Sequence, residues 1–364
     1  MKTLKLFSVP SHQTEERTSG VDFVRVIQPM KYLDGYEYDN YKFKVDIFDI
    51  FKKKDWMTVA KEYDAVFVNY TVLDWAYAAM GCFVHGKGKK IIMDMDDALW
   101  YVNPDNIAYE ALKEHNSGYV ITQILRDVDA ITTTNSYLRN LIAHKTNKPH
   151  ELIKVIPNSV DLKYYNHKSP SKERNTITLF HYGSTSHFDD LSRPDFVEGM
   201  DRIFKDYPNV HFRAIGANIP KLKGKWGERY TYGWGHSDIY KWIGEKFPKY
   251  MNEADIMVVP LMDNRYNVCK SDIKFLESST ALKPGVYSDM RPYRETIEHG
   301  VTGYLAKTPE DWYNYLKILI DSVEKRKERT GTNITYDNRL TFAHFGSFVL
   351  VHTFVRLVKF YARK

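Results

Sequence analysis

The order of apolar runs along the chain constrains its fold more than any other feature of the sequence. In the first half, short runs such as "TLKLFSV", "DAVFVNY", "KKIIMDMD" and "LIKVIPN" alternate with longer amphipathic stretches. This rhythm is typical of βαβ units, in which parallel strands are buried on both faces and joined by helices. The sequence therefore predicts an α/β fold with parallel sheets.

The same rhythm starts again after the polar segment 164–176, with runs such as "ITLFHYGS", "NVHFRAIG", "ADIMVVP" and "PGVYSD". A chain of 364 residues is long enough for two domains that each bury their own core. We therefore expect two Rossmann-like, doubly wound domains, residues 1–168 and 169–335, that face a central cleft. In such domains ligands bind at the carboxyl ends of the strands, so the cleft is the expected place for a site.

The last stretch, residues 336–364, is dominated by apolar and aromatic residues and carries several Lys and Arg near its end. We expect a C-terminal helical segment that packs back on the N-terminal domain. A basic, amphipathic helix can also lie on a membrane surface, and the sequence leaves both interpretations open.

Composition indicates in which compartment the protein is expected and which classes of partner it can bind. The net charge of +6 and the aromatic fraction of 15% fit nucleotides, phospholipid surfaces or nucleic acid, without choosing among them. Two cysteines, Cys82 and Cys269, are too few for a disulfide framework. The first apolar run reads as a strand and not as a signal peptide, and no run approaches the roughly 18 apolar residues of a membrane span. We expect a cytoplasmic protein, or one held peripherally at the inner face of a membrane.

The stretch "CKSDIKFLE" places positive charge directly after an apolar run that reads as a buried strand. A helix is expected to begin near Ser271 or Asp272, and free N–H groups and the helix dipole favour a phosphate there. Lys270 and Lys274 would add charge to the same anion. Glu277 is expected on the same helical face as both lysines, where it can accept hydrogen bonds from a ribose. A surface helix with an internal salt bridge explains the charges, but not their position after a strand.

Two glycine-containing turns are further candidates for an anion or sugar site. In "HYGSTSHFDDL", the amides at Gly183 and Ser184 are expected to approach a diphosphate, with His187 as a secondary contact or an ordinary packing residue. In "TSGVDFVR", the turn at Gly20 opens a helix, and Arg25 is expected to reach the cleft. The G-x-G-x-x-G fingerprint of dinucleotide-binding enzymes is absent, which lowers the oxidoreductase alternative.

Three carboxylates, Asp94, Asp96 and Asp97, follow another buried strand in "IIMDMDDALW". They fit an Asp-x-Asp metal site. Alternatively, one of them orients an acceptor hydroxyl or stabilises positive charge on a sugar. Asp97 can also cap the following helix. We expect Asp94 or Asp96 to be catalytic. We expect no metal site, because lysines in the other domain can supply the counter-charge of a diphosphate.

Several segments in order resemble the GT-B glycosyltransferases, and within them the retaining, GT4-like group that uses nucleotide sugars. They are "TSGVDFVRVIQPMKYL", "IIMDMDDALW", "VIPNSVDLKYY", "LFHYGSTSHFDDL" and the long stretch that begins "KSDIKFLESSTALKPGVYSD". Many relatives carry two glutamates eight positions apart. Glu277 matches the second, whereas Cys269 stands at the first. The chain is similar to a subgroup that has the arrangement of Lys270, Ser271 and Lys274 instead.

The resemblance implies a donor held by the second domain and an acceptor held mainly by the first. The expected reaction is retaining, metal-independent transfer of a hexose from a UDP- or GDP-sugar to a saccharide or lipid-linked acceptor, with no further cofactor. Lys274 and the helix start would stabilise the departing nucleotide diphosphate. Two alternatives stay open: a DNA-modifying enzyme that acts on a modified base, as some phage GT-B enzymes do, and a non-catalytic nucleotide-sugar-binding module.

Overall fold

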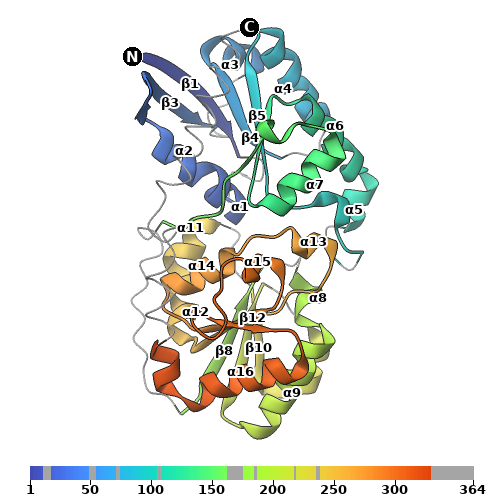
Figure 1. Ribbon diagram of the computed structural model, residues 1–364, viewed down its shortest axis with the longest axis vertical. Helices are drawn as coiled ribbons and strands as arrows, with labels where there is room; N and C mark the ends of the chain where they lie inside the picture. Colours follow the sequence, from blue (N-terminus) through green and yellow to red (C-terminus); the bar gives the residue numbers. More distant parts are fainter. Residues whose placement is uncertain are drawn as a thin grey trace.

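The computed structural model describes residues 1–10, 18–48, 55–70, 74–104, 106, 109–161, 175–183, 187–216, 219–234 and 238–328. Two sheets, each covered by helices on both faces, lie one beyond the other along the long axis of the molecule (Figure 1). The predicted architecture of two doubly wound α/β units is therefore confirmed. We call them the first unit, built on strands β1 to β7, and the second unit, built on β8 to β13.

The first unit has the strand order β2-β3-β1-β4-β5-β6-β7, and its pairs are parallel except β2 with β3. Its strands are β1 (Lys2–Val9), β2 (Glu37–Tyr38), β3 (Tyr41–Ile47), β4 (Ala65–Asn69), β5 (Lys90–Met95), β6 (Ala130–Thr133) and β7 (Ile153–Val155). Its helices are α1 (Gly20–Asp22), the π-helical η1 (Phe23–Ile27), α2 (Gln28–Leu33), α3 (Trp56–Glu62), α4 (Asp74–Gly86), η2 (Leu99–Tyr101), α5 (Tyr109–Glu114), α6 (Ser117–Asp127), α7 (Ser136–Thr146) and η3 (His150–Leu152).

The second unit has the strand order β10-β9-β8-β11-β12-β13, with parallel pairs throughout. Its strands are β8 (Ile177–Tyr182), β9 (Val210–Ile215), β10 (Tyr230–Gly233), β11 (Ile256–Val259), β12 (Gly285–Ser288) and β13 (Tyr304–Ala306). Its helices are α8 (Phe188–Leu191), α9 (Pro194–Asp206), α10 (Pro220–Trp226), η5 (Gly227–Arg229), α11 (Ile239–Lys241), η6 (Trp242–Lys246), α12 (Phe247–Glu253), α13 (Arg265–Val268), α14 (Ile273–Thr280), α15 (Arg291–Arg294) and α16 (Pro309–Asp321).

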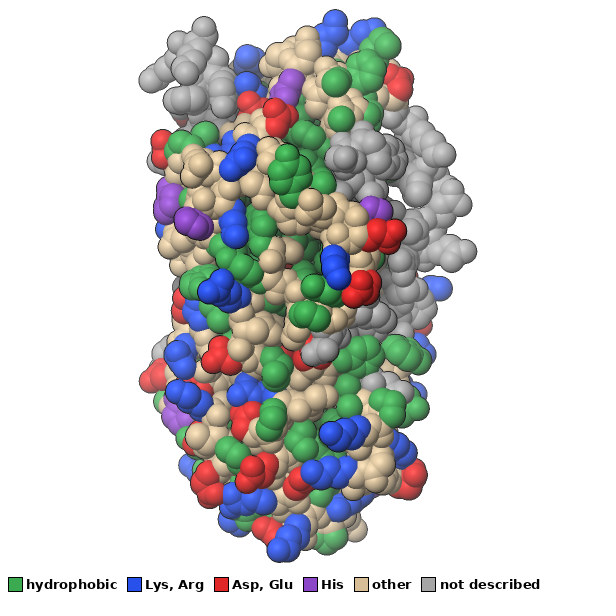
Figure 2. All heavy atoms as spheres, turned by 90° about the vertical axis from the view of Figure 1, so that its right-hand side faces the viewer, with side chains coloured by type: hydrophobic (Ala, Val, Ile, Leu, Met, Phe, Trp, Pro, Cys, Tyr) green, Lys and Arg blue, Asp and Glu red, His purple; other side chains and the backbone are tan. Residues whose placement is uncertain are grey.

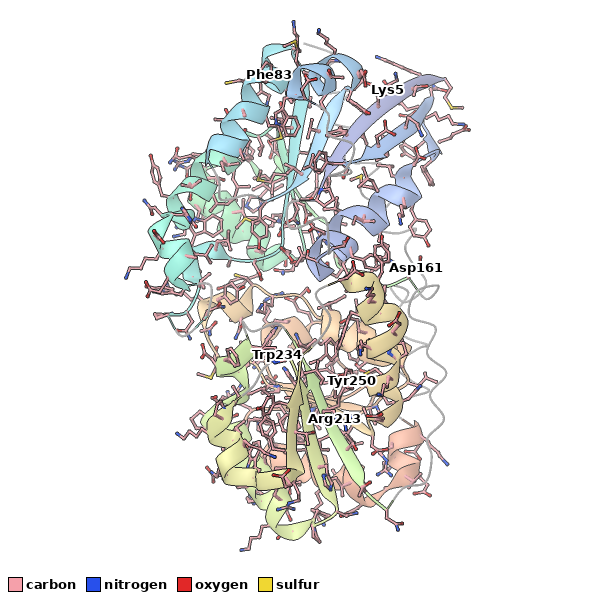
Figure 3. All side chains as sticks on the ribbon, turned by 180° about the vertical axis from the view of Figure 1, so that it is seen from behind. Lys5, Phe83, Asp161, Arg213, Trp234 and Tyr250 are labelled. Carbon is pink, nitrogen blue, oxygen red and sulfur yellow. The ribbon has the colours of Figure 1, made fainter. Side chains whose placement is uncertain are left out.

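The two units share apolar packing at their junction. Tyr266 and Cys269 of the second unit belong to an apolar cluster of the first unit, and Phe23 of the first belongs to a cluster of the second. The Phe23 ring also meets the Tyr240 ring edge to face, with centroids 5.4 Å apart. Asp161, near the junction in Figure 3, accepts a hydrogen bond from the Tyr32 hydroxyl. This shared packing holds the carboxyl ends of the two sheets toward one another.

Two expectations lie outside the described residues. The predicted boundary between residues 168 and 169 falls within 162–174, and the predicted C-terminal helical segment begins at residue 336. Within the ranges that the structure describes, no helix is both long and apolar enough to cross a bilayer.

Candidate functional site

A cavity of about 380 Å³ lies between the two units, at the carboxyl ends of their strands. The starts of α1 and α14 lie near this junction (Figure 1). The cavity is lined from the first unit by Gly20, Val21, Val24, Arg25, Asp96, Asp97 and Asn158, and from the second by Tyr182, Gly183, His187, Ile215, Ile239, Trp242, Leu261, Lys270, Ser271, Ile273, Lys274, Glu277 and Tyr293. Of the predicted site residues that the structure describes, all except Asp94 are in this lining. Ser184 lies outside the described residues.

The start of α14 is the part of the cavity that most resembles an anion site. The helix begins at Ile273, with Asp272 at the N-cap position, as expected. The Asp272 side chain does not cap the helix, because its Oδ2 accepts a hydrogen bond of 2.5 Å from Thr296 Oγ1 instead. The Asp272 carboxylate thus makes no capping hydrogen bond to the first turn of α14, and the backbone N–H groups and the helix dipole at this turn favour an anion.

Lys274 lies one residue into α14, and its ammonium is enclosed by two side chains of the second unit. Nζ lies 3.1 Å from Nε2 of His187 and 5.8 Å from the centroid of the Tyr182 ring. Burial, and after it the charge of Lys270, lower the pKa of Lys274 to about 8. Because the Lys274 ammonium is buried and lies near a second cation, an anionic ligand would strongly stabilise its charged form.

Lys270 is not on the helix, which corrects the expectation that it shares a helical face with Lys274 and Glu277. It precedes α14, and its backbone carbonyl accepts a hydrogen bond of 2.7 Å from Arg291. Its Nζ lies 3.6 Å from Oδ1 of Asp97 in the first unit and 4.6 Å from the centroid of the Tyr266 ring. The Lys270 side chain therefore lies on the part of the cavity wall next to the first unit.

Glu277 and Ser271 are each held by a partner that the sequence did not single out. The Glu277 carboxylate accepts a hydrogen bond of 2.5 Å from the hydroxyl of Tyr182, the last residue of β8. Ser271 Oγ accepts a hydrogen bond of 2.7 Å from Nδ2 of Asn158 in the first unit. The segment 270–277 is thus attached to both units at once.

His187 connects Lys274 to a buried carboxylate. Its Nδ1 lies 2.6 Å from Oδ2 of Asp190, whose Oδ1 also accepts from the Met262 amide and from Asn267 Nδ2, each at 2.7 Å. Burial acts to raise the pKa of Asp190, but the bond with His187 and the other interactions lower it to about 2. Burial and the charge of Lys274 lower the pKa of His187 to about 4. Asp190 is therefore ionised and His187 neutral near pH 7.

Gly183 has a different role from the predicted one. Its amide donates a hydrogen bond of 2.9 Å to the Ile215 carbonyl, so this N–H is not available to a diphosphate. A Cβ at Gly183 would lie 2.6 Å from Cδ2 of His187, closer than real Cβ contacts. The missing side chain makes room for the imidazole ring.

Arg25 and Asp94 form a buried ion pair in the first unit. Arg25 Nη2 and Nε donate to the two oxygens of Asp94 at 2.7 and 3.0 Å, and Thr132 Oγ1 donates to Asp94 at 2.5 Å. Arg25 Nη1 donates to the Ile156 carbonyl at 2.6 Å and to Asn158 Oδ1 at 2.9 Å. Burial acts to lower the pKa of Arg25, but Asp94 outweighs it and raises that pKa. All of these partners belong to the first unit, and Asp94 does not line the cavity.

Asp96 and Asp97 line the cavity from the first unit, and Asp97 lies next to Lys270. Asp97 accepts a hydrogen bond of 2.8 Å from the Tyr266 hydroxyl, and it does not cap the following η2, whose N-cap position is Ala98. Oδ1 of Asp96 is buried without a hydrogen-bond partner among the described residues. Burial, reinforced by the charges of Asp97 and Asp94, raises the pKa of Asp96 to about 7. Asp96 is therefore the carboxylate with free capacity to accept a hydrogen bond from a ligand.

No group of three or more His, Cys, Asp or Glu side chains within the described ranges is arranged to hold a metal ion. Sequence reasoning assigned no role to Tyr182, Asp190, Asn158 and Tyr266. The spacing of Asp190, three residues after His187 at a helix start, was the one local signal among them. The other contacts join segments far apart in the chain.

The second unit matches a known family. The model of the family described as Glycosyl transferases group 1 matches residues 182–322, a range that includes the segment 270–277, Gly183, His187 and Asp190. A comparison with curated proteins finds no match.

Solved structures similar to this chain show which fold it has. HepE (Alr3699) of Anabaena, in complex with UDP and glucose, aligns with a TM-score of 0.66 and 14% identity over 97% of this chain and 99% of that chain. HepE has also been solved with UDP-glucose. A glycosyltransferase from Rickettsia africae ESF-5 aligns with a TM-score of 0.62 and 13% identity over 99% of this chain and 98% of that chain. The predicted GT-B fold is therefore confirmed.

Proposed function

We propose that this chain is a glycosyltransferase that moves a hexose from a UDP-sugar to a hydroxyl of a saccharide or lipid-linked acceptor, with retention of configuration. One observation carries the proposal: Lys270 and Lys274 of the second unit face Asp96 of the first across one cavity at the strand ends. Cations suit a departing diphosphate, and a carboxylate suits a sugar hydroxyl or the positive charge that develops on a sugar. The family match over residues 182–322 supports the same reaction class.

The donor occupies the second unit in this proposal. Its diphosphate lies at the start of α14 beside Lys274 and Lys270, and Ser271 adds a hydroxyl. Glu277, held by Tyr182, accepts hydrogen bonds from the ribose hydroxyls. We favour UDP over GDP because structures of HepE, which has a similar fold, contain UDP and UDP-glucose.

The chemistry follows from where charge develops. As the bond between the sugar carbon and the diphosphate oxygen breaks, negative charge grows on the diphosphate next to two ammonium groups, which lowers the barrier. The acceptor oxygen attacks the same face of the sugar, and its proton passes to the departing phosphate oxygen. Asp96 orients the acceptor hydroxyl and stabilises the positive charge on the sugar. Asp94, committed to Arg25, supports the fold of this wall and does not touch substrate.

Metal independence is part of the proposal. Lys270 and Lys274 supply the positive charge that a divalent cation supplies to the diphosphate in other transferases. We predict that EDTA leaves the rate within about twofold of the untreated enzyme, because the two lysines already neutralise the diphosphate. Activity that vanishes with EDTA and returns with manganese would show that a metal is required.

The charged groups around the cavity bear on which class of acceptor the enzyme uses. Asp96 and Asp97 place two carboxyl groups on the acceptor side, and a carboxyl group is a poor neighbour for a phosphate directly beside the reacting hydroxyl. Among the described residues of the face in Figure 2, Lys and Arg side chains are interspersed with Asp and Glu. We therefore favour a sugar hydroxyl over a base in DNA. Co-sedimentation with liposomes, beside a gel shift with duplex DNA at several salt concentrations, distinguishes a membrane-associated acceptor from nucleic acid.

The experiment that tests the proposed function is a screen of nucleotide sugars by thermal shift, followed by an assay for nucleotide release. We expect UDP-sugars to raise the melting temperature, and UDP to be released from one of them. Binding of UDP-sugars without release of UDP, even with a saccharide mixture present, would favour a non-catalytic binding module. Stabilisation by GDP-sugars alone would correct the donor.

A further inference from the structure

Asp190, His187 and Lys274 form a chain of polar contacts that ends in the cavity. Asp190 Oδ2 lies 2.6 Å from His187 Nδ1, and His187 Nε2 lies 3.1 Å from Lys274 Nζ. Asp190 is exposed to 1% and His187 to 5%, so neither exchanges these partners for bulk water. The chain joins α8 to α14, two elements that lie far apart in the sequence.

The direction of each hydrogen bond follows from the charges. Asp190 can only accept, so the proton of the neutral imidazole lies on Nδ1. Nε2 then carries a lone pair and accepts from the Lys274 ammonium. The opposite tautomer would place two donors against each other at 3.1 Å. Asp190 therefore selects the tautomer that lets His187 hold Lys274.

Lys274 has three N–H groups, and this contact uses one of them. The centroid of the Tyr182 ring lies 5.8 Å from Nζ. Lys274 lines the cavity, so a ligand bound there can meet its other N–H groups. A long lysine side chain loses rotamer freedom when it is fixed, so a residue that fixes it before the anion arrives improves binding.

We propose that Asp190 and His187 are positioning residues that hold the Lys274 ammonium toward the donor diphosphate, and that His187 itself does not contact the phosphate. This inference rests on the proposed function, because it assumes that a nucleotide diphosphate occupies the cavity. It replaces the sequence-based expectation that His187 is a phosphate contact.

Other charged and titratable groups surround the same ammonium and enter its pH dependence. The groups that face His187 are Asp190, Lys274, Lys270 and His181. Those that face Lys274 from the surrounding elements are Lys270, Glu277, Asp97, His181 and Asp190. With these groups in place, the pKa of Lys274 is about 8, lowered mainly by burial. Affinity for an anion is therefore expected to fall as the pH rises through about 8. Loss of the His187 lone pair removes a partner of the charged form and moves that decline to lower pH.

The test measures UDP affinity by titration calorimetry in His187→Ala and His187→Gln, with His144→Ala as the control. His144 is an exposed histidine in the last turn of α7. The Gln side chain can place an amide oxygen near the position of Nε2. We expect UDP binding to weaken at least tenfold in the Ala variant and less than threefold in the Gln variant, with no change in the control. Equal losses in Ala and Gln, or no loss in either, would overturn the positioning role.

Two further readouts separate positioning from a merely structural role. The alkaline decline of UDP affinity should move to lower pH by about one unit or more in the Ala variant, the size expected for loss of one hydrogen bond to a charged group. An unmoved pH profile contradicts the proposal. Asp190→Asn should weaken binding severalfold in the wild-type background and much less in the Gln background, where no tautomer needs to be selected. The same loss in both backgrounds would show that Asp190 acts without His187.

The outcome for the wild-type protein distinguishes the two claims. If wild-type protein does not bind UDP at any pH, the proposed function fails, and this inference fails with it. If wild-type protein binds UDP and the His187 variants bind it equally well, the proposed function stands and the positioning role is wrong. Melting temperatures of each variant identify any loss of affinity that comes from unfolding.

Discussion

At the scale of single residues, three carboxylates close together in sequence receive three different environments. Asp94 is bound by Arg25 and Thr132, and Asp97 by Tyr266 and Lys270. Asp96 keeps a buried oxygen without a partner among the described residues. A buried carboxylate oxygen without a hydrogen bond costs stability, and such a cost is common where a group is kept available for substrate.

This cost leads to a prediction for Asp96→Asn. The folded pKa of Asp96 is about 7, above its ordinary value of 3.8, so ionisation of Asp96 opposes folding. The penalty is absent below about pH 4, grows as the pH rises toward 7, and is complete above it. We expect the neutral Asn variant to melt about 2 °C or more above wild type at pH 8, which corresponds to roughly 1 kcal/mol or more.

Thermal melts of both proteins at pH 5 and pH 8 check the prediction, and the difference should be smaller at pH 5. Nucleotide release in the presence of acceptor should fall at least tenfold in the same variant, while UDP affinity changes less than threefold. A variant that is less stable than wild type at pH 8, or that keeps full transfer activity, would contradict the role given to Asp96.

At the scale of elements, the turn between β8 and α8 shows why a glycine is needed where no unusual backbone angle is required. Gly183 lies against the His187 ring, and a Cβ there would come within 2.6 Å of Cδ2. Gly199 in α9 has an equally close neighbour, because its Cβ would lie 2.6 Å from Cβ of Trp312 in α16. One glycine supports the site and the other supports helix packing.

The two glycines form a matched pair of substitutions. Gly183→Ala should displace the imidazole and weaken UDP binding about tenfold, the size of one lost charge-assisted hydrogen bond. Gly199→Ala should lower stability by about 1–3 kcal/mol through overpacking, and leave UDP affinity unchanged. Calorimetry and thermal melts of both variants give the two readouts. Wild-type affinity for UDP in Gly183→Ala would show that Gly183 does not support the site.

At the scale of the whole molecule, the site exists only because two units face each other. Asn158 links Arg25 to Ser271, and Asn135 Nδ2 donates to the Cys269 carbonyl at 2.7 Å. Both bonds join the first unit to the segment that precedes α14. Hydrogen bonds, together with the shared apolar packing, therefore hold the donor side of the cavity against the acceptor side.

The fold could be predicted from the sequence because parallel strands buried on both faces leave short, nearly continuous apolar runs. Lys274 and Glu277 could be placed together because helical spacing puts residues three apart on one face. The place of Lys270 could not be predicted, because its side chain lies beside Asp97 of the first unit, far away in the sequence. The bonds of Asp190 to Met262 and Asn267 span more than 70 residues, and no local pattern predicts contacts of that kind.

The central claim is that Lys274, at the start of α14, binds the diphosphate of a nucleotide. Its most direct test is the affinity for UDP, measured by titration calorimetry at pH 7, of wild type, Lys274→Ala and Lys317→Ala. Lys317 is an exposed lysine paired with Asp321 on α16, on the helical layer of the second unit. The account predicts at least tenfold weaker binding in Lys274→Ala and unchanged binding in Lys317→Ala. Equal affinity in all three proteins, or no binding of UDP by wild type, would contradict it.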